Sequence, residues 1–586
     1  MICRPETRLF GALGLAILTL GGCEDAGGDL SPIESARAEL AQGNPLAAEI
    51  LLERALDEGA ARHDVAALFG EAELQEGDLR AAREWLGPGE FSDDTRALGF
   101  RLLGRLEMRE GRLAQAGAAF DRSYRADPDN SQLWVDIGRL RYLGGEQIQA
   151  IEAADRALEL EPENGHALVF RGQLARDARG LSSGAAMLGR ALELLPDDSE
   201  LRAEYAATLV DAGRAAEGLA VIRQGEGDVS VTPRGFYVQA IVAARGGNLG
   251  LARDLLNRSG MIQEGVPAAL LLSAIADLEE QNFASAAQTL ARLHSRQPDN
   301  RRVRDLFALA LYRSGGEREL VYRFANYARG GSGSTYLRAL VGRAYEALDQ
   351  RERAAEFLDR AAAGGSNLSV LPSMTPPETL AVSKGVSGLD TRDYVRSAIA
   401  RRETMAAVRR ARDFARRFPG SGDAYAILGD AQFAQGNKRA AREAYERAAQ
   451  VRRPWPLALR LAGAQDSRDT ARQLLEGYVR ENPMNGEAAA MLADALAAEE
   501  EWGRAALLLD HAMGLGMERV PWVLAARSVA AVQLDDAETA LAFALAAHEL
   551  QPMNPLAIAA LLAVLPEEEA AARAELTAKL RSLTKD

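Results

Sequence analysis

Apolar residues recur along this chain with the spacing of helices that bury one face. Between Ser131 and Asn164 they follow each other at three- and four-residue intervals in two stretches, separated by Gly145-Glu146. This interval is typical of an amphipathic helix, and glycine at the break favours a turn. Pro162 follows the second stretch, where a helix has to end. The segment therefore predicts a helix, a turn and a second helix.

The same unit is repeated along most of the chain. A small residue returns every 34 positions, at Ala36, Gly70, Gly104, Gly138, Gly172, Ala206, Ala240, Ala274, Ala308 and Gly342. A second series follows twelve residues behind, from Ala48 to Ala354, in which only Leu320 is large. A fixed period of this length indicates a repeat architecture. Small residues at one phase predict that two helices cross closely there in every repeat.

The segments between units carry turn signals at the same period. Pro128, Pro162 and Pro196 are 34 residues apart, and each is followed by Asp, Glu or Asn side chains. Such residues favour turns, and Asp or Asn can cap the next helix. We therefore expect a capped helix to start after each proline.

These positions resemble the tetratricopeptide repeat. The small residues of that family at repeat positions 8, 20 and 27 and its proline at 32 correspond to Gly138, Ala150, Ala157 and Pro162, and Trp134 stands where the family often has tryptophan. The resemblance implies an all-α solenoid, a right-handed superhelix of antiparallel helix pairs. It also implies a concave face that binds peptides or proteins.

The repeats form two blocks. We expect about ten in residues 31–363 and about five in residues 390–565, followed by a capping helix in 566–586 that starts at Pro566. Residues 364–389 interrupt the period and are rich in Gly, Ser and Pro, which disfavour helix. This insert is predicted to be a hinge, a gate over the groove, or a segment packed on a neighbouring helix.

The first residues predict export and lipidation. Two arginines precede an apolar run from Leu9 to Leu20, which is too short to span a bilayer and fits a secretory signal in residues 1–22. Leu20-Gly21-Gly22-Cys23 resembles the bacterial lipobox, which implies a lipid on Cys23 and a short tether in residues 23–30. An ordinary signal peptide with an incidental cysteine is the alternative. After cleavage, no second cysteine remains to form a disulfide.

Lipidation would place the chain in a bacterial envelope, facing the periplasm. An aspartate directly after the lipidated cysteine favours the inner membrane in enteric bacteria. Here Glu24 holds that position and Asp25 follows. We expect the outer membrane, with the inner membrane as the alternative.

Composition argues against several functions. The net charge of −15 disfavours nucleic acid as a partner. The five histidines lack metal-ligand spacing, and no phosphate-binding loop is present. Gly180-Leu-Ser-Ser-Gly184 matches a nucleophile-elbow string but follows no predicted strand. We therefore predict no enzyme activity, metal, cofactor or small-molecule substrate.

One group of groove positions is basic. By the geometry of the family, positions 2, 5, 9, 12 and 13 of each first helix line the groove. These positions predict a binding strip for an acidic segment of a partner, formed by Arg101, Arg105, Arg109, Arg139, His166, Gln173 and Arg176. The alternative is that these side chains form salt bridges with neighbouring acids such as Glu107 and Glu110.

Together these features predict a periplasmic scaffold. Lipoproteins that resemble this chain occur in pilus assembly, outer-membrane protein insertion and polysaccharide or exosortase-type export. The sequence does not choose among them. A regulatory or accessory subunit of a cell-envelope synthase is the alternative function.

Overall fold

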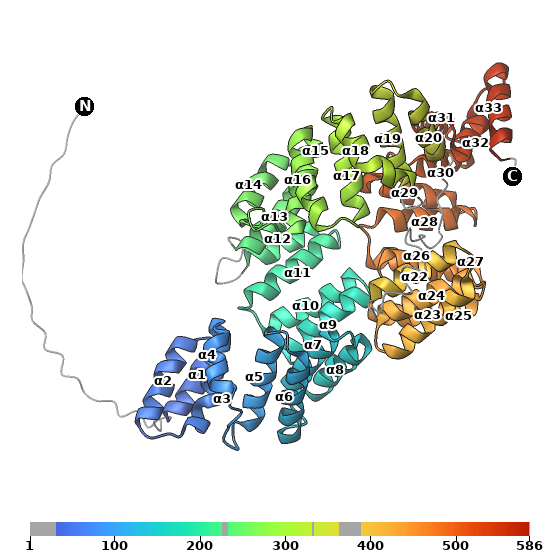
Figure 1. The fold of residues 1–586 in the computed structure, drawn as a ribbon. Coiled ribbons are helices and arrows are strands. Elements are labelled where there is room, and N and C mark those ends of the chain that lie inside the picture. The colour runs from blue at the N-terminus through green and yellow to red at the C-terminus, as the bar shows by residue number, and fades with distance from the viewer. Residues whose placement is uncertain (1–30, 225–231, 331–332, 363–387, 585–586) are drawn as a thin grey trace, which may run out of the picture. The chain divides into compact units, whose positions relative to one another are not determined.

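The computed structural model describes residues 31–224, 232–330, 333–362 and 388–584. Within these ranges it contains 32 α-helices and no strand (Figure 1). The signal peptide, Cys23, the tether and nearly all of the predicted insert lie outside the described residues. None of the helices in the described ranges is both long and apolar enough to cross a bilayer.

Ten helix pairs precede the insert, as the period predicts. They are α1 (Pro32–Ala41) with α2 (Pro45–Asp57), α3 (Arg62–Glu76) with α4 (Leu79–Leu86), α5 (Arg96–Arg109) with α6 (Leu113–Ala126), α7 (Ser131–Leu143) with α8 (Gln147–Leu160), α9 (Gly165–Ala178) with α10 (Leu181–Leu194), α11 (Ser199–Asp211) with α12 (Ala215–Arg223), α13 (Pro233–Arg245) with α14 (Leu249–Ser259), α15 (Pro267–Glu279) with α16 (Phe283–Arg296), α17 (Arg301–Arg313) with α18 (Glu317–Arg329), and α19 (Thr335–Ala347) with α20 (Arg351–Ala362).

Five further pairs follow the insert. They are α22 (Gly388–Ala400) with α23 (Thr404–Arg417), α24 (Gly422–Ala434) with α25 (Lys438–Val451), α26 (Trp455–Gly463) with α27 (Arg468–Glu481), α28 (Gly486–Ala497) with α29 (Trp502–Ala512), and α30 (Pro521–Gln533) with α31 (Ala537–Leu550). A π-helical turn, η2 (Met513–Met517), extends α29. The chain ends in α32 (Pro555–Val564) and α33 (Ala570–Leu583). The last helix begins at Ala570 and not at Pro566, with residues 567–568 in a turn before it.

The predicted caps are present. The side chains of Asn130, Asn164 and Asp198 accept hydrogen bonds from the backbone N–H groups of Leu133, Ala167 and Leu201, each at 2.9 Å. Each bond satisfies a backbone donor that the first turn of a helix leaves unpaired. The turn residues therefore fix where the first helix of each repeat begins.

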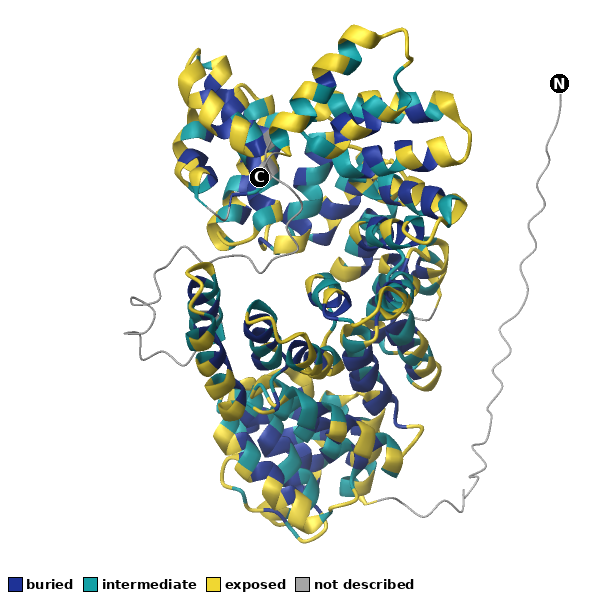
Figure 2. Cartoon of the chain, turned by 90° about the vertical axis from the view of Figure 1, so that its right-hand side faces the viewer, coloured by how far each residue is buried: buried dark blue, intermediate teal, exposed yellow. Residues whose placement is uncertain are grey.

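The small residues lie where the two helices of a repeat cross. Ala36, Ala206 and Ala308 are fully buried. A Cβ atom on Gly104 would collide with the ring of Phe120, which α6 presents to α5. In Figure 2 the buried residues run along one side of each helix, and the turns are exposed. The core is thus a chain of small contacts between neighbouring helices, as a solenoid requires.

The turn inside most of the described repeats contains a residue with positive φ. This residue is Gly213 at φ 83°, Gly247 at φ 76° and Gly315 at φ 77°, each 34 residues or a multiple of 34 apart. Gln281 takes the same place at φ 63° and Asp349 at φ 57°. Side chains with a Cβ atom are strained in this region, so these two repeats store a small cost in their turns.

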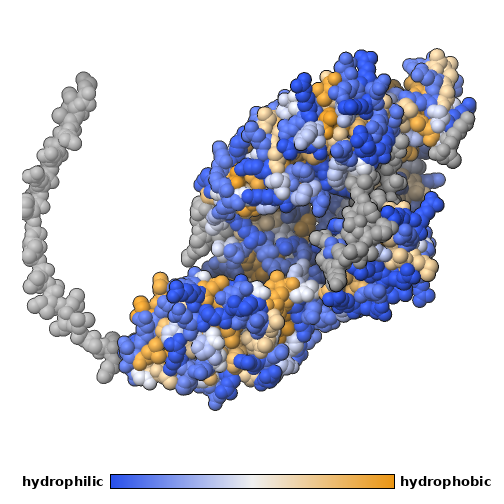
Figure 3. All heavy atoms as spheres, in the orientation of Figure 1, coloured by the Kyte–Doolittle hydropathy of each residue, from blue (hydrophilic) through white to orange (hydrophobic). Residues whose placement is uncertain are grey.

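The described chain divides into two compact units, with the boundary between Asp127 and Pro128. The first unit holds α1–α6. The second unit holds the remaining helices, so it includes repeats from both blocks. Figure 3 shows that hydrophilic residues dominate the face in view and that apolar residues form small groups between them.

Inside the larger unit, turns of the second block pack on turns of the first block (Figure 1). The N–H of Ile148 donates to the carbonyl of Gly420 (3.1 Å), and the N–H of Arg453 donates to the carbonyl of Asp177 (2.8 Å). Glu481 accepts hydrogen bonds from the N–H and the Oγ of Ser183, both at 3.1 Å. We call this set of contacts the seam.

The seam follows the repeats on both sides. A Cβ atom on Gly213 would lie 3.0 Å from the sulfur of Met484, about one repeat beyond the contact of Asp177 with Arg453 in both blocks. Each step of about one repeat along the first block therefore meets a step of about one repeat along the second. Residues some 300 positions apart in sequence become neighbours in this way.

Candidate functional site

The basic strip predicted from sequence begins on α5. Arg101, Arg105 and Arg109 are four residues apart, so they lie along one side of that helix. The Nη1 of Arg109 donates to the carbonyl of Leu74 at 2.8 Å, which ties the strip to the end of α3. Burial lowers the pKa of Arg109, and the neighbouring charge of Arg105 adds to this.

A carboxylate of α3 faces this part of the strip. Burial raises the pKa of Glu71, and the positive charges of Arg101 and Arg105 oppose that rise. Both guanidinium groups therefore act on one partly buried carboxyl group. Because desolvation is the largest contribution, the two arginines compensate the buried charge only in part.

The acids named as alternative partners of the strip are used elsewhere. Glu107 accepts a hydrogen bond from Arg83 of α4 at 2.6 Å, and both Glu107 and Glu110 pair with Arg83 and Arg112. Glu107 is largely buried. This network holds α4, α5 and the start of α6 together.

The predicted strip residues of the larger unit have a different environment. Gln173 donates to Glu204 of α11 at 2.9 Å, and Arg176 donates to the same carboxylate at 3.0 Å. Arg139 lies over the ring of Phe170 at 5.9 Å from its centroid. His166 is exposed in the first turn of α9. The salt-bridge alternative thus describes Arg176, with Glu204 as its partner.

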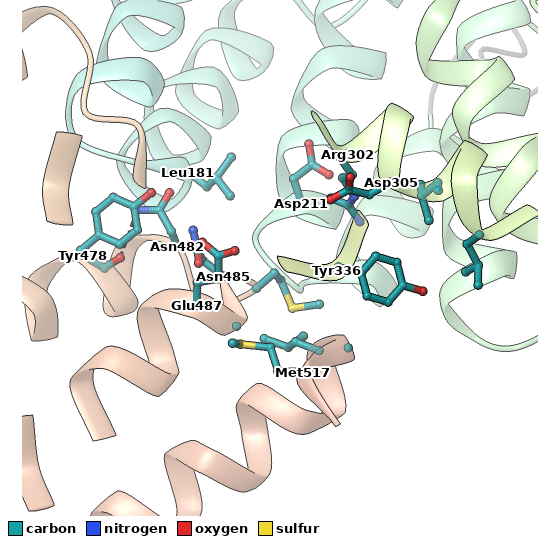
Figure 4. Close-up of a pocket in the computed structure, with 16 residues that line it drawn as sticks. Leu181, Asp211, Arg302, Asp305, Tyr336, Tyr478, Asn482, Asn485, Glu487 and Met517 are labelled. Atoms are coloured by element: carbon teal, nitrogen blue, oxygen red, sulfur yellow. Dashed lines mark hydrogen bonds between the residues drawn. The ribbon is translucent and has the colours of Figure 1, made fainter. Parts of the chain in front are cut away.

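A cleft of about 910 Å³ lies in the larger unit (Figure 4). One wall comes from the first block and consists of Leu181, Asp211, Arg302, Asp305, Leu306, Leu309 and Tyr336. The other wall comes from the second block and consists of Tyr478, Asn482, Met484, Asn485, Gly486, Glu487, Leu515, Gly516 and Met517. The volume is in the range of small-ligand sites, about 300–1,000 Å³.

Most of the first wall occupies groove positions. Arg302, Asp305 and Leu309 are residues 2, 5 and 9 of their repeat, and Tyr336 is residue 2 of the next. Asp211 is residue 13 of an earlier repeat. The position rule that predicts the basic strip therefore also predicts this wall. The wall differs from the strip because its side chains, apart from Arg302, are acidic, aromatic or aliphatic.

The carboxyl group of Asp305 has one hydrogen-bonded oxygen and one buried oxygen without a partner among the described residues. Its Oδ2 accepts a hydrogen bond from the Oγ of Ser334 at 2.9 Å. Its Oδ1 is buried and has no hydrogen-bond partner among the residues that the structure describes. Burial raises the pKa of Asp305, against the hydrogen bond from Ser334 and the charge of Arg304. Burial also raises the pKa of Asp211, whose carboxylate lies 3.5 Å from Arg245.

The opposite wall is built from the turn before α28 and from η2. Asn482 donates to the carbonyl of Tyr478 at 3.0 Å, and Asn485 caps α28 by accepting from the N–H of Ala488 at 2.9 Å. Gly516 has a left-handed backbone at φ 100°, which lets η2 turn beside this wall. No local sequence signal could have placed these turns opposite Asp305, because the seam brings them there.

A family model for the tetratricopeptide repeat matches the chain twice, at residues 101–165 and 395–458. The matches fall in both blocks, and the helix pairs continue the same period between and around them. Both matched segments are tetratricopeptide repeats. Among curated proteins, none matches it.

Solved structures similar to this chain include three with low sequence identity. The Cut9-Hcn1 hetero-tetramer of the APC/C has 14% identity over 88% of this chain and 99% of that chain, with a TM-score of 0.33. YrrB, a TPR protein with an unusual peptide-binding site, has 21% identity over 30% and 90%, with a TM-score of 0.25. PilW, a type IV pilus biogenesis factor, has 18% identity over 40% and 93%, with a TM-score of 0.28.

Within the described residues, one group of side chains could hold a metal ion. Carboxylate oxygens of Glu49, Glu73 and Glu76 lie within 4.8 Å of one another in the first unit. Burial, followed by repulsion from Glu49 and other acids, raises the pKa of Glu73 to about 7. A carboxyl group that holds its proton up to this pH relieves the repulsion without a cation. Acidic clusters of this kind are common on protein surfaces, and we assign no metal to this one.

Proposed function

We propose that this tetratricopeptide-repeat protein is a lipid-anchored scaffold that holds partner proteins in the bacterial envelope during assembly or export. The fold itself is an interaction scaffold, and its groove positions line a cleft in the larger unit. That cleft is the observation that carries the proposal, because a concave site lined by both apolar side chains and hydrogen-bonding or charged groups is suited to hold a segment of a partner.

The anchor rests on the sequence before the first helix. Positive charge, a short apolar run and Leu20-Gly21-Gly22-Cys23 support export and lipidation of Cys23. The first helix starts at Pro32. A tether of this length spans about 15 Å, so the first repeat would stay near the membrane, with the outer membrane as the proposed location.

Affinity purification from detergent-solubilised membranes tests this function. The full chain should co-purify with a defined envelope protein, and density-gradient fractions should place it with outer-membrane markers. The Cys23→Ala variant should move to the soluble periplasmic fraction and keep its partner in lysates. A chain that fractionates with the cytoplasm, or that retains no partner with either variant, would refute the proposal. A synthase as the partner would support the accessory-subunit alternative.

A further inference from the structure

The cleft has two walls that belong to different blocks, and the seam holds these blocks together beside it. Asp211, Asp305 and Tyr336 come from the first block, and Asn482, Asn485 and Glu487 come from the second (Figure 4). The contact of Ser183 with Glu481 lies beside the cleft, because Leu181 and Asn482 belong to its lining. The site is therefore complete only when the seam is closed.

More acidic than basic side chains line the cleft, which favours a cationic ligand group, while Arg245 already pairs with Asp211 and Arg301 and Arg304 act on Asp305. The lining contains three carboxylates, Asp211, Asp305 and Glu487, and one guanidinium group, that of Arg302. The buried Oδ1 of Asp305 is an acceptor with no donor from the described part of the chain. A buried acceptor without a partner is costly, so a ligand that brings an N–H donor gains both the hydrogen bond and the charge pairing.

The remaining lining selects an apolar chain around that cation. Leu306 and Leu309 of α17 face the cleft from one side, and Met484, Leu515 and Met517 face it from the other. Asn482 and Asn485 add amide groups that can bond to a peptide backbone. A volume of about 910 Å³ is large for one side chain and suits a few residues of extended peptide.

We propose that the cleft binds an extended peptide segment that presents an arginine or lysine to Asp305 between apolar side chains, and that it does so only while the seam is closed. This inference rests on the proposed scaffold function and specifies one class of partner segment for it. The basic segment bound here is distinct from the acidic segment expected at the strip of α5.

Peptide display against the purified full chain tests the proposal. Panning of a random library should enrich sequences with Arg or Lys flanked by Leu, Ile, Val or Phe. A synthetic peptide of the enriched sequence then serves as the probe in fluorescence anisotropy. Asp305→Asn should weaken its binding about tenfold, as should replacement of its basic residue by Gln. Asp299 is an exposed acid just before α17, the helix that holds Asp305. Asp299→Asn is therefore the matched control and should change the affinity less than twofold.

The seam has its own test. Ser183 lies in the first turn of α10, where Asp is favourable, so Ser183→Asp preserves the helix but places a second negative charge against Glu481. We expect about a tenfold loss of probe affinity. Adding Glu481→Arg should restore attraction and return the affinity to within about threefold. Circular dichroism should show unchanged helix content in both variants.

Several outcomes would overturn the proposal. These are enrichment of acidic peptides, no enrichment above background, equal binding by Asp305→Asn, or equal binding of a probe stripped of its apolar residues, which would mean a site for small cations alone. Unchanged affinity in Ser183→Asp would overturn the role of the seam. If partner capture from membranes persists while every peptide test fails, the scaffold function stands and only this inference fails.

Discussion

The groove positions of α5 and α9 differ in how their charges are balanced. On α5, Arg101 and Arg105 act on a partly buried Glu71 whose pKa stays raised. On α9, Gln173 and Arg176 share Glu204, a largely buried carboxylate of the next first helix. Groove positions thus face a partly buried carboxyl group on α5, whereas on α9 they share one carboxylate through direct hydrogen bonds.

The position of a residue in the repeat therefore predicts that its side chain lies at the groove, but not that it is available to a partner. A residue at position 5, 9, 12 or 13 lies at the groove by the geometry of the repeat, yet a neighbouring repeat can supply its counter-charge, as Glu204 does for Arg176 at position 12. On α9, Glu204 accepts hydrogen bonds from both Gln173 and Arg176.

Removal of Glu204 should have the largest effect. Glu204→Ala leaves Arg176 and Gln173 without their shared acceptor in a site where the carboxylate is only 13% exposed. We expect a loss of about 2–3 kcal/mol in the free energy of unfolding of α9–α11. Native-state hydrogen exchange of the amides in these helices measures it. Glu193→Ala, an exposed acid of α10, should cost less than about 0.5 kcal/mol. Equal losses would mean that the network is not structural.

Charge reversal on α5 should weaken partner capture without loss of fold. Arg105→Glu, alone or with Arg139→Glu, should reduce the capture of an acidic partner segment about tenfold, because the groove charge changes sign. Retention of the partner in a pull-down and the helical signal in circular dichroism are the measurements. Arg176→Gln should leave capture within about twofold, since Arg176 is occupied by Glu204. Capture that survives both reversals would exclude the strip as a binding surface.

The first unit should lose stability as the pH rises towards 7. Burial and nearby acids raise the pKa of Glu73 from 4.5 to about 7 in the folded chain. The folded state therefore holds this proton more tightly than the unfolded state, so the stabilising contribution is present below pH 4.5 and is lost between pH 4.5 and 7. Glu73→Gln should flatten this slope and raise the melting temperature at pH 8 by about 2 °C. Thermal unfolding from pH 5 to 8 measures both, and an unchanged slope would contradict the assignment.

The smallest effect concerns the left-handed position in the turn of a repeat, which is glycine in some repeats and a residue with a Cβ atom in others. Gln281 has φ 63° where the neighbouring repeats have Gly247 and Gly315. Gln281→Gly should remove the strain of a left-handed Cβ residue and raise the stability by about 0.5–1 kcal/mol, after the entropy cost of glycine. Gly247→Ala should have the opposite sign. Chemical denaturation compares them, and a stabilising Gly247→Ala would disprove the strain argument.

The repeats were predictable because their signals are local and periodic. The segment from Ser131 to Asn164 predicts α7 and α8, since the caps, the turn glycine and the small residues lie within one period. The start of the last helix was placed four residues early, at Pro566, because proline and acids favour a helix start but do not determine it.

The candidate site was predictable only in part. The position rule applied to every repeat would have drawn attention to Asp305 and Tyr336 as well as to Arg105. It would also have drawn attention to Glu487, which is residue 2 of its repeat on α28, but not to Met517, which lies in the π-helical turn η2. Nor does any local pattern link Ser183 to Glu481, which are 298 residues apart.

The one-to-one matching of turns along the seam has a consequence for how this chain can change in length. Solenoids grow by duplication of a repeat, and each copy contacts only its neighbours. Here a duplication between α8 and α12 would displace Gly213 from Met484 and move Asp211 away from the opposite wall. Such an event would be tolerated only with a matching duplication between α24 and α28. A change in the number of repeats in one block would therefore require the same change in the other block.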